Sequence, residues 1–232
     1  MRAIILAAGR GTRIRAFTNS SHKALLKIGK ISIIERQVLI LQKAGINDIL
    51  VITGHQHSKI KNELAKHNIK FVHNHNYFNS ETLFSLKCAQ DYFNDEFVCL
   101  YSDLIFDEKI LTQLISTNNE ICLIVDKSKI TFDSHTVHVN NNLVKEFGIN
   151  LKSMANGQYI GLAKYSKTGS QILRKTLDNF SQKDMKEEVV NALAKIALEY
   201  NNVYCIFTNG LQWFNINRIE NLAEARLLST LI

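Results

Sequence analysis

Apolar residues in this chain fall into short continuous runs that alternate with segments of helical periodicity. The first run covers residues 2–8 and ends at Gly9, which is typical of a buried strand in a parallel sheet. Ser32 begins a stretch with apolar residues at helical spacing, in which Glu35 completes a capping box and Gly45 marks the end. A strand, a loop and a helix in this order predict the beginning of an α/β domain.

The alternation continues along most of the chain, and we expect a single domain over residues 1–232. Further strands are predicted over residues 49–53, 69–73, 97–101, 121–125, 159–165, 203–207 and 213–214. Further helices are predicted over residues 58–67, 82–93, 107–114, 167–180 and 185–200 and from residue 218 onward. Strands that alternate with helices in this way indicate βαβ units and a parallel or mixed sheet.

Residues 136–147 depart from this alternation. Val137 and Val139 alternate with polar residues, three consecutive asparagines follow at 140–142, and a second apolar stretch comes after them. Two short alternating segments around such a turn predict a β-hairpin. We therefore expect a small hairpin insertion at about residues 133–158.

The composition is that of a globular protein, because 46% of the 232 residues are hydrophobic and 21% are charged. The first apolar run is too short to cross a membrane, and it continues into Gly9 and Arg10 rather than into a cleavage site. The cysteines stand singly, without C-x-x-C spacing, at Cys88, Cys99, Cys122 and Cys205. They indicate reduced thiols in a cytoplasmic protein rather than a zinc site or a disulfide framework.

The charge balance favours anionic partners. Lysine and arginine number 28 and aspartate and glutamate 21, which gives a formal net charge of +7. The charges are scattered, without a block of like charges interleaved with aromatic residues, so we expect neither a nucleic-acid partner nor a membrane partner. The sequence leaves open whether the chain forms a homodimer.

The loop after the first strand is the first candidate for binding chemistry, because ligands of open α/β sheets bind beyond the carboxyl ends of the strands. Gly9 and Gly11 let the backbone approach a polyanion, while Arg10 and Arg13 supply positive charge. Ile14 breaks both the dinucleotide fingerprint and the Walker A spacing. The loop therefore predicts a phosphate-binding site that matches neither of these two motifs. An ordinary glycine-rich turn is the alternative.

Residues 1–26, MRAIILAAGRGTRIRAFTNSSHKALL, resemble the signature that opens the sugar-phosphate nucleotidyltransferases, L-A-A-G-x-G-[ST]-R with a Pro-Lys pair further on. Beyond this segment the chain looks like the small cytidylyltransferases of the phosphocholine and 2-aminoethylphosphonate kind. The segments that carry this wider similarity are Ile34–Gln37, Gly45–Ile46, Thr53–Gly54, Thr82–Leu86, Tyr101–Asp103, Ile160–Lys164 and Trp213–Asn217. The similarity extends over nearly the whole chain.

The resemblance implies a Rossmann-like nucleotidyltransferase fold with a mixed, mostly parallel central sheet flanked by helices. It also implies Mg²⁺-dependent transfer of a nucleoside monophosphate, foremost CMP from CTP, to a small phosphorylated or phosphonate acceptor, with release of pyrophosphate. Such reactions supply precursors of cell-surface polysaccharides or lipids. Two alternatives remain: a sugar-1-phosphate nucleotidyltransferase that uses UTP, dTTP or GTP, and a nucleotide-binding homologue with weakened catalysis.

When the family's site residues are assigned to the matching positions of this chain, the resemblance also implies a set of site residues. The expected nucleotide-binding residues are Leu6, Ala7, Ala8, Gly9, Gly11, Thr12, Arg13, Lys23, Thr82, Ser85 and Asp103. Among them Lys23 would neutralise the α-phosphate, Arg13 would hold the outer phosphates, and Asp103 would hold Mg²⁺, so these three are the expected catalytic residues. Nucleotidyl transfer needs such positioning and charge stabilisation and no protein nucleophile.

The acceptor and metal ends depart from the family pattern. The expected acceptor-binding residues are Tyr159, Lys164 and Trp213. The rings of Tyr159, Trp213 and Phe214 could surround a quaternary ammonium group or, as the alternative, belong to the core. Asn215 and Asn217 stand where relatives have carboxylates, so Asp103 and Asn217 are the expected metal ligands, with a helix cap as the alternative for Asn217. His22, Glu81 and Ile149 replace the family's proline, asparagine and lysine.

Overall fold

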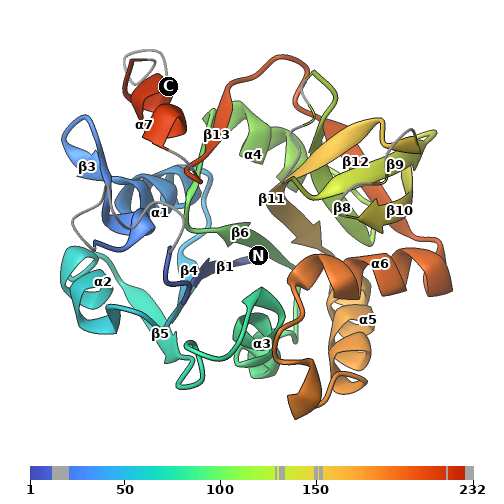
Figure 1. The fold of residues 1–232 in the computed structure, drawn as a ribbon, viewed down its shortest axis with the longest axis horizontal. Coiled ribbons are helices and arrows are strands. Elements are labelled where there is room, and N and C mark those ends of the chain that lie inside the picture. Colours follow the sequence, from blue (N-terminus) through green and yellow to red (C-terminus); the bar gives the residue numbers. More distant parts are fainter. Residues whose placement is uncertain are drawn as a thin grey trace.

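The computed structural model describes residues 1–11, 21–128, 130, 134–148, 151, 154–217 and 219–227. A nine-stranded mixed sheet with the order β5-β4-β1-β6-β11-β8-β12-β10-β9 runs through the molecule (Figure 1). Its strands are β1 (Arg2–Ala7), β4 (Asp48–Thr53), β5 (Ile69–His73), β6 (Phe97–Tyr101), β8 (Ile121–Asp126), β9 (Thr136–Asn140), β10 (Leu143–Gly148), β11 (Gly157–Tyr165) and β12 (Val203–Phe207). Two small sheets pair β2 (Lys27–Ile28) with β3 (Ile31–Ser32) and β7 (Leu104–Phe106) with β13 (Trp213–Asn215).

Helices cover both faces of the large sheet. The α-helices are α1 (Ile33–Lys43), α2 (His57–Glu63), α3 (Thr82–Lys87), α4 (Glu108–Ile115), α5 (Lys167–Asp178), α6 (Val189–Tyr200) and α7 (Ile219–Leu227), and short 3-10 helices occupy η2 (Lys23–Leu25), η3 (Gln90–Tyr92) and η5 (Gln182–Asp184). Apolar residues of α1, α2 and α4 form one core cluster and those of α3, α5 and α6 another. Figure 1 shows these two groups of helices on opposite sides of the sheet.

Side chains along each buried strand alternate between the two faces of the large sheet, which explains why both faces are apolar. On β1, Ile4 and Leu6 belong to the cluster with α3, α5 and α6, whereas Ile5 and Ala7 belong to the cluster with α1, α2 and α4. Successive side chains of a strand point to opposite faces, so a strand covered on both sides must be apolar throughout. This is the continuous run seen in the sequence.

Strand direction decides where a site can form. β1 pairs in parallel with β4 and β6, and β4 pairs in parallel with β5, so the carboxyl ends of these four strands share one edge. β11 runs antiparallel between β6 and β8, and its first residues therefore reach this same edge while its last residues lie at the opposite one. The predicted mixed α/β sheet is confirmed.

Local signals in the sequence correspond to observed contacts at several boundaries. The Ser32 hydroxyl accepts a hydrogen bond from the Glu35 amide at 3.2 Å and caps α1. Asn141 and Asn142 adopt left-handed φ angles of 49° and 62° in the turn between β9 and β10. The predicted hairpin therefore forms, and it joins the large sheet through β10–β12 and β9–β11 pairing.

Three predicted helices are shorter than expected, and the one expected over 58–67 ends already at Glu63. The helix expected over 82–93 ends at Lys87, and η3 follows it. The helix expected over 185–200 begins only at Val189, after η5 and a turn. The Met185 carbonyl in that turn accepts a hydrogen bond from the Glu81 amide at 2.7 Å, so a tertiary contact holds it outside a helix.

Within the described part of the chain, no helix combines the length and apolar character that crossing a membrane requires.

Candidate active site

A pocket opens at the shared carboxyl edge of β1 and β6. Its lining comes from four segments and consists of Leu6, Ala8, Gly9, Gly11, His22, Lys23, Tyr77, Ser80, Glu81, Thr82, Ser85, Tyr101, Ser102 and Asp103. Most of the expected nucleotide residues are in this set. Thr12 and Arg13, also expected there, lie outside the described residues.

Ala7 is an expected nucleotide-binding residue of the first strand that does not line the pocket. Leu6 and Ala8 line the pocket, but Ala7 is fully buried on the other side of β1. The expectation that Ala7 contacts the nucleotide is corrected by strand alternation, which turns its methyl group away into the core.

The glycines of the first loop serve different purposes. A Cβ atom at Gly9 would meet nothing within 4 Å, so this glycine leaves open space in the pocket. Gly11 has a left-handed φ of 59°, and a Cβ atom there would lie 2.9 Å from Cγ of Lys23. The absent side chain at Gly11 therefore makes room for the lysine stem.

Three polar side chains from distant parts of the chain meet at Lys23. Its Nζ atom donates to Asn217 Oδ1 at 2.7 Å and to Asp103 Oδ2 at 3.2 Å. Lys23 begins η2, Asp103 follows β6, and Asn217 follows β13. The fold thus brings together one expected catalytic lysine and both expected metal ligands.

His22 fixes the start of η2 beside this cluster. Its Nδ1 atom accepts a hydrogen bond from the Ala24 amide at 3.1 Å, and its own amide donates to Gln56 Oε1 at 3.0 Å. Burial, followed by the nearby His55, lowers the pKa of His22 from 6.5 to about 4. Its φ of −63° is the angle that a proline ring would impose, so histidine keeps the backbone shape of the family's proline.

Gln37 is a positioning residue that sequence reasoning missed. It is 1% exposed on the inner face of α1, and its side-chain amide donates to the carbonyl oxygens of Tyr101 at 2.8 Å and Leu104 at 2.7 Å. These bonds hold the turn that carries Asp103. A polar residue within the apolar face of a predicted helix was the signal available, since buried polar groups need partners.

Thr82 and Ser85 line the pocket while their hydroxyl groups also hold the surrounding chain. Thr82 Oγ1 accepts from the Val189 amide at 3.0 Å, which ties α3 to the start of α6. Ser85 Oγ accepts from Asn74 Nδ2 at 3.0 Å and donates to the Glu81 carbonyl at 3.3 Å. Both residues are therefore part of the pocket wall as well as expected neighbours of the base.

Lys164 was expected to bind the acceptor, and the structure corrects this expectation. It pairs with Val98 near the beginning of β6, at the opposite edge of the sheet from Asp103. Its Nζ atom is engaged by the carbonyl oxygens of Ile115 at 2.9 Å and Thr117 at 2.6 Å, where α4 ends. A cation at the carboxyl end of a helix is a structural cap.

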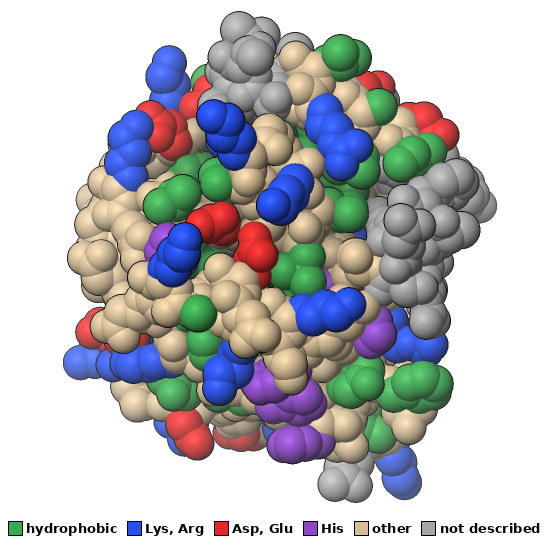
Figure 2. Space-filling model, turned by 90° about the vertical axis from the view of Figure 1, so that its left-hand side faces the viewer, with side chains coloured by type: hydrophobic (Ala, Val, Ile, Leu, Met, Phe, Trp, Pro, Cys, Tyr) green, Lys and Arg blue, Asp and Glu red, His purple; other side chains and the backbone are tan. Residues whose placement is uncertain are grey.

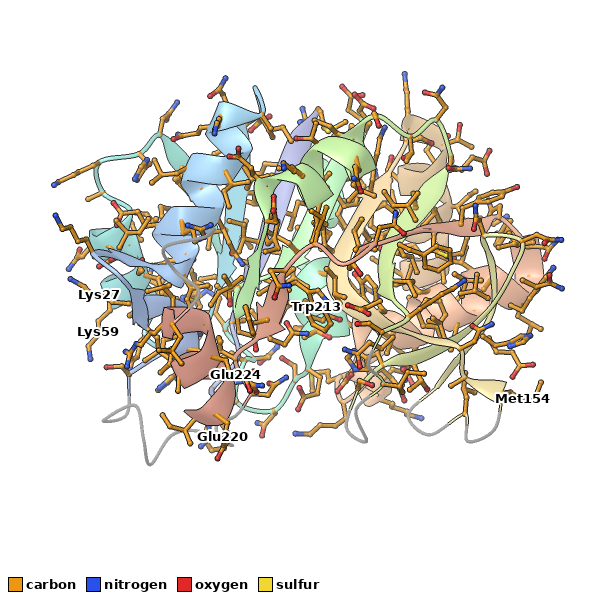
Figure 3. All side chains as sticks on the ribbon, turned by 90° about the horizontal axis from the view of Figure 1, so that it is seen from above. Lys27, Lys59, Met154, Trp213, Glu220 and Glu224 are labelled. Carbon is orange, nitrogen blue, oxygen red and sulfur yellow. The ribbon has the colours of Figure 1, made fainter. Side chains whose placement is uncertain are left out.

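Of the two expected acceptor aromatics, Tyr159 is buried and Trp213 is half-buried. Tyr159 is 4% exposed and packs edge-to-face on Tyr101 and Phe147, so the core alternative describes it better than the ligand role. Trp213, labelled in Figure 3, packs partly buried against the core, and its indole nitrogen donates to Asp126 Oδ2. Burial acts to raise the pKa of Asp126, but hydrogen bonds from Ser128 and Trp213 hold that pKa below its usual value.

A half-buried polar pair near the pocket was not predicted from the sequence. His135 Nε2 contacts Glu188 Oε2 and links the chain before β9 to the start of α6. The Tyr101 ring lies 6.4 Å from the His135 ring, and burial raises the pKa of the Tyr101 phenol. Nothing in the local sequence around either residue indicates this pairing, because it depends on how β9 and α6 are arranged in space.

Histidine side chains gather on the face shown in Figure 2. The rings of His57 and His73 are 4.7 Å apart and those of His73 and His75 are 4.5 Å apart, beside the ends of β4 and β5. His57 Nδ1 is also 2.6 Å from Thr53 Oγ1. Among the described residues, no group of three or more His, Cys, Asp or Glu side chains has an arrangement that fits a metal ion.

Comparisons with known proteins agree with this architecture. The chain is 27% identical to the CTP:phosphoglutamine cytidylyltransferase of Campylobacter jejuni over an alignment of 248 positions, which covers 96% of this chain and 98% of that protein. It is 26% identical to the choline-phosphate cytidylyltransferase of Haemophilus influenzae over 224 residues, which cover 97% and 94% of the two chains.

A solved structure of CTP:phosphocholine cytidylyltransferase from Streptococcus pneumoniae superposes with a TM-score of 0.82 at 20% identity and covers 98% of both chains. At that identity the likeness shows the fold. A family model described as the MobA-like NTP transferase domain matches residues 3–151, which is more than half of the chain and includes the glycine loop, Lys23 and Asp103. The protein is therefore a nucleotidyltransferase that belongs to the MobA-like NTP transferase domain family.

Proposed function

We propose that this protein transfers CMP from CTP to a small acceptor that carries a phosphate or phosphonate group, and releases pyrophosphate. The observation that carries the proposal is the meeting of Lys23, Asp103 and Asn217 at the mouth of a glycine-lined pocket. The pyrimidine nucleotide and the phosphorylated acceptor follow the names of the relatives, which use CTP with phosphoglutamine or choline phosphate.

The reaction needs positioned substrates and stabilised charge. An oxygen of the acceptor phosphate attacks the α-phosphorus, a new phosphoanhydride bond forms, and the bond to the departing pyrophosphate breaks. Negative charge grows on the α-phosphate oxygens as five-coordinate phosphorus forms. Lys23 is the cation that would meet this charge, and Gly9 leaves the space in which the nucleotide can approach the backbone.

Mg²⁺ is part of the proposal. Asp103 and Asn217 direct oxygen atoms at one cation, the Lys23 ammonium, and such oxygens suit Mg²⁺, which commonly combines one or two protein ligands with substrate phosphates and water. When bound, the metal would neutralise triphosphate charge. Asp103 supplies the full negative charge for it and Asn217 a neutral amide oxygen.

The outer phosphates are assigned to Gly11 and to Arg13, of which Arg13 lies outside the described residues. The pocket wall formed by Thr82 and Ser85 is assigned to the base. The acceptor would enter beside Tyr101, on the side where His135 and Glu188 join β9 to α6.

The test is a pyrophosphate-release assay with CTP, UTP, GTP and dTTP against phosphocholine, phosphorylated glutamine, inositol-1-phosphate and sugar-1-phosphates, with mass spectrometry of the products. We expect pyrophosphate and a CMP-linked product from CTP with one of the phosphorylated acceptors. Faster turnover of UTP, GTP or dTTP with a sugar-1-phosphate would replace this assignment by the alternative activity. Binding of a triphosphate without turnover of any pair would indicate the homologue with weakened catalysis.

A further inference from the structure

The ammonium group of Lys23 occupies the position between the two oxygens assigned to a metal. Its nitrogen is 2.7 Å from Asn217 Oδ1 and 3.2 Å from Asp103 Oδ2, and the Lys23 and Asp103 side chains are only 13% and 21% exposed. Both oxygens therefore already coordinate a cation that belongs to the protein. A divalent ion can use the same two oxygens only when the ammonium moves away.

The charges at this position balance. Asp103 contributes one negative charge, Asn217 contributes none, and Lys23 contributes one positive charge. His22 adds no charge near neutral pH, because burial lowers its pKa to about 4. A single ammonium thus satisfies the site, whereas a carboxylate at position 217 would leave one negative charge over and would favour a divalent ion.

The stem of Lys23 is also fitted to this placement. Gly11 packs against it so closely that a Cβ atom would lie 2.9 Å from Lys23 Cγ, and η2 fixes the lysine backbone through the His22 cap. The side chain is therefore held at its base, along its stem and at its charged end. Such a side chain is preorganised as a ligand of Asp103 and Asn217.

We propose that Asn217 is a positioning residue which, together with Asp103, holds Lys23 as the resident cation of the nucleotide-free protein. Lys23 and a divalent metal then compete for the same two oxygens, and the free protein binds the metal weakly. The inference rests on the proposed function, in which the released ammonium turns to the α-phosphate. The asparagine at 217 makes metal binding depend on the triphosphate, whose oxygens supply the missing negative charge.

The experiment measures Mn²⁺ binding to the free protein by electron paramagnetic resonance, with no nucleotide or acceptor present. Lys23→Met removes the resident cation and should raise the affinity for Mn²⁺ about tenfold or more. Asn217→Asp should raise it as well, because an added negative charge attracts a divalent ion twice as strongly as it attracts an ammonium. Lys43→Met removes a surface lysine that pairs with Glu108 at 2.7 Å and should leave the affinity unchanged.

Equal Mn²⁺ affinity in the wild type and Lys23→Met, including no measurable binding by either, overturns the proposal, and so does weaker binding by Asn217→Asp. A purely structural role of Asn217 would not raise the affinity. If Lys23→Met fails to fold, which circular dichroism detects, Asn217→Asp alone decides. The assay contains no substrates, so a protein that releases no pyrophosphate would overturn the proposed function without changing this result.

Discussion

The proposed nucleotide end and the proposed acceptor end of the site are built in different ways. At the nucleotide end, one short segment that follows β1 directly, Ala8 to Gly11, supplies backbone and glycine positions to the pocket. The acceptor end depends on side-chain pairs between remote elements, such as Trp213 with Asp126 and His135 with Glu188. Local sequence specifies this glycine segment, whereas the side-chain pairs of the acceptor end exist only after the sheet and α6 have assembled.

This difference explains which expectations the structure corrects. Lys164 lies in a segment that resembles relatives, and its position on β11 suggested a place near the acceptor. Because β11 is antiparallel to β6, three residues along the strand separate Gly161, beside the Tyr101 ring, from a lysine near the opposite edge of the sheet. Strand direction cannot be derived from the apolar pattern of a strand, so the residue was assigned to the wrong end.

The largest expected effect contrasts two lysines, one at each edge of the sheet. Lys23→Ala should lower kcat about 10²–10³-fold, because it removes the cation that meets charge developing in the transition state. Lys164→Met should leave kcat unchanged but reduce stability by about 1–3 kcal/mol, since the carbonyls of Ile115 and Thr117 lose their buried donor. Steady-state kinetics and urea unfolding measure the two effects. Unchanged kcat in Lys23→Ala, or a large loss in Lys164→Met, would reverse the assignment of the two edges.

His22 should make the nucleotide end sensitive to acid. Its pKa is about 4 in the folded protein and 6.5 when unfolded, so the unfolded chain binds the extra proton first as the pH falls. Stability should therefore decrease between about pH 6.5 and pH 4 and level off below, with an upper bound of about 3 kcal/mol. His22→Asn keeps an acceptor for the Ala24 amide but cannot titrate, and its unfolding free energy should show less of this decrease. Parallel pH curves for the two proteins would contradict the buried neutral histidine.

The variant Trp213→Phe tests whether Trp213, at the proposed acceptor end, stabilises the core or binds the acceptor. Losing the indole donor to Asp126 should reduce stability by about 1–3 kcal/mol, because a buried carboxylate oxygen loses a partner. If Trp213 serves the core, the KM for the acceptor changes little. A large rise in that KM with unaltered thermal stability would instead restore the ligand role that the sequence resemblance implied.

Two glycines in one loop give the smallest effects and serve as each other's control. Gly11→Ala should destabilise the fold by about 1–2 kcal/mol, because its φ of 59° disfavours a side chain and the added methyl meets the Lys23 stem. Gly9→Ala has free space and should leave thermal stability unchanged while it raises the KM for the nucleotide. Equal melting temperatures for both variants would show that the loop does not pack against Lys23 in this way.

The sequence predicted much of the fold because its signals are local. Continuous apolar runs indicated the buried strands, and the Ser32 cap and the asparagine turn located α1 and the hairpin. The pairing of that hairpin with β11 and β12 was not predictable, since it depends on contacts between distant segments. The same limit applies to the site, where Gln37 and the His135–Glu188 pair act across elements that no motif connects.

The central claim is that the pocket binds CTP beside Lys23 and Asp103, and thermal unfolding in the presence of CTP, UTP, GTP or dTTP with Mg²⁺ tests it most directly. A ligand present at 100 times its dissociation constant adds about 2.7 kcal/mol to stability. The account predicts that CTP stabilises the protein at the lowest concentration, and that Lys23→Ala retains part of this stabilisation because its main contact forms in the transition state. Stronger stabilisation by UTP, GTP or dTTP, or no stabilisation by any triphosphate, would contradict it.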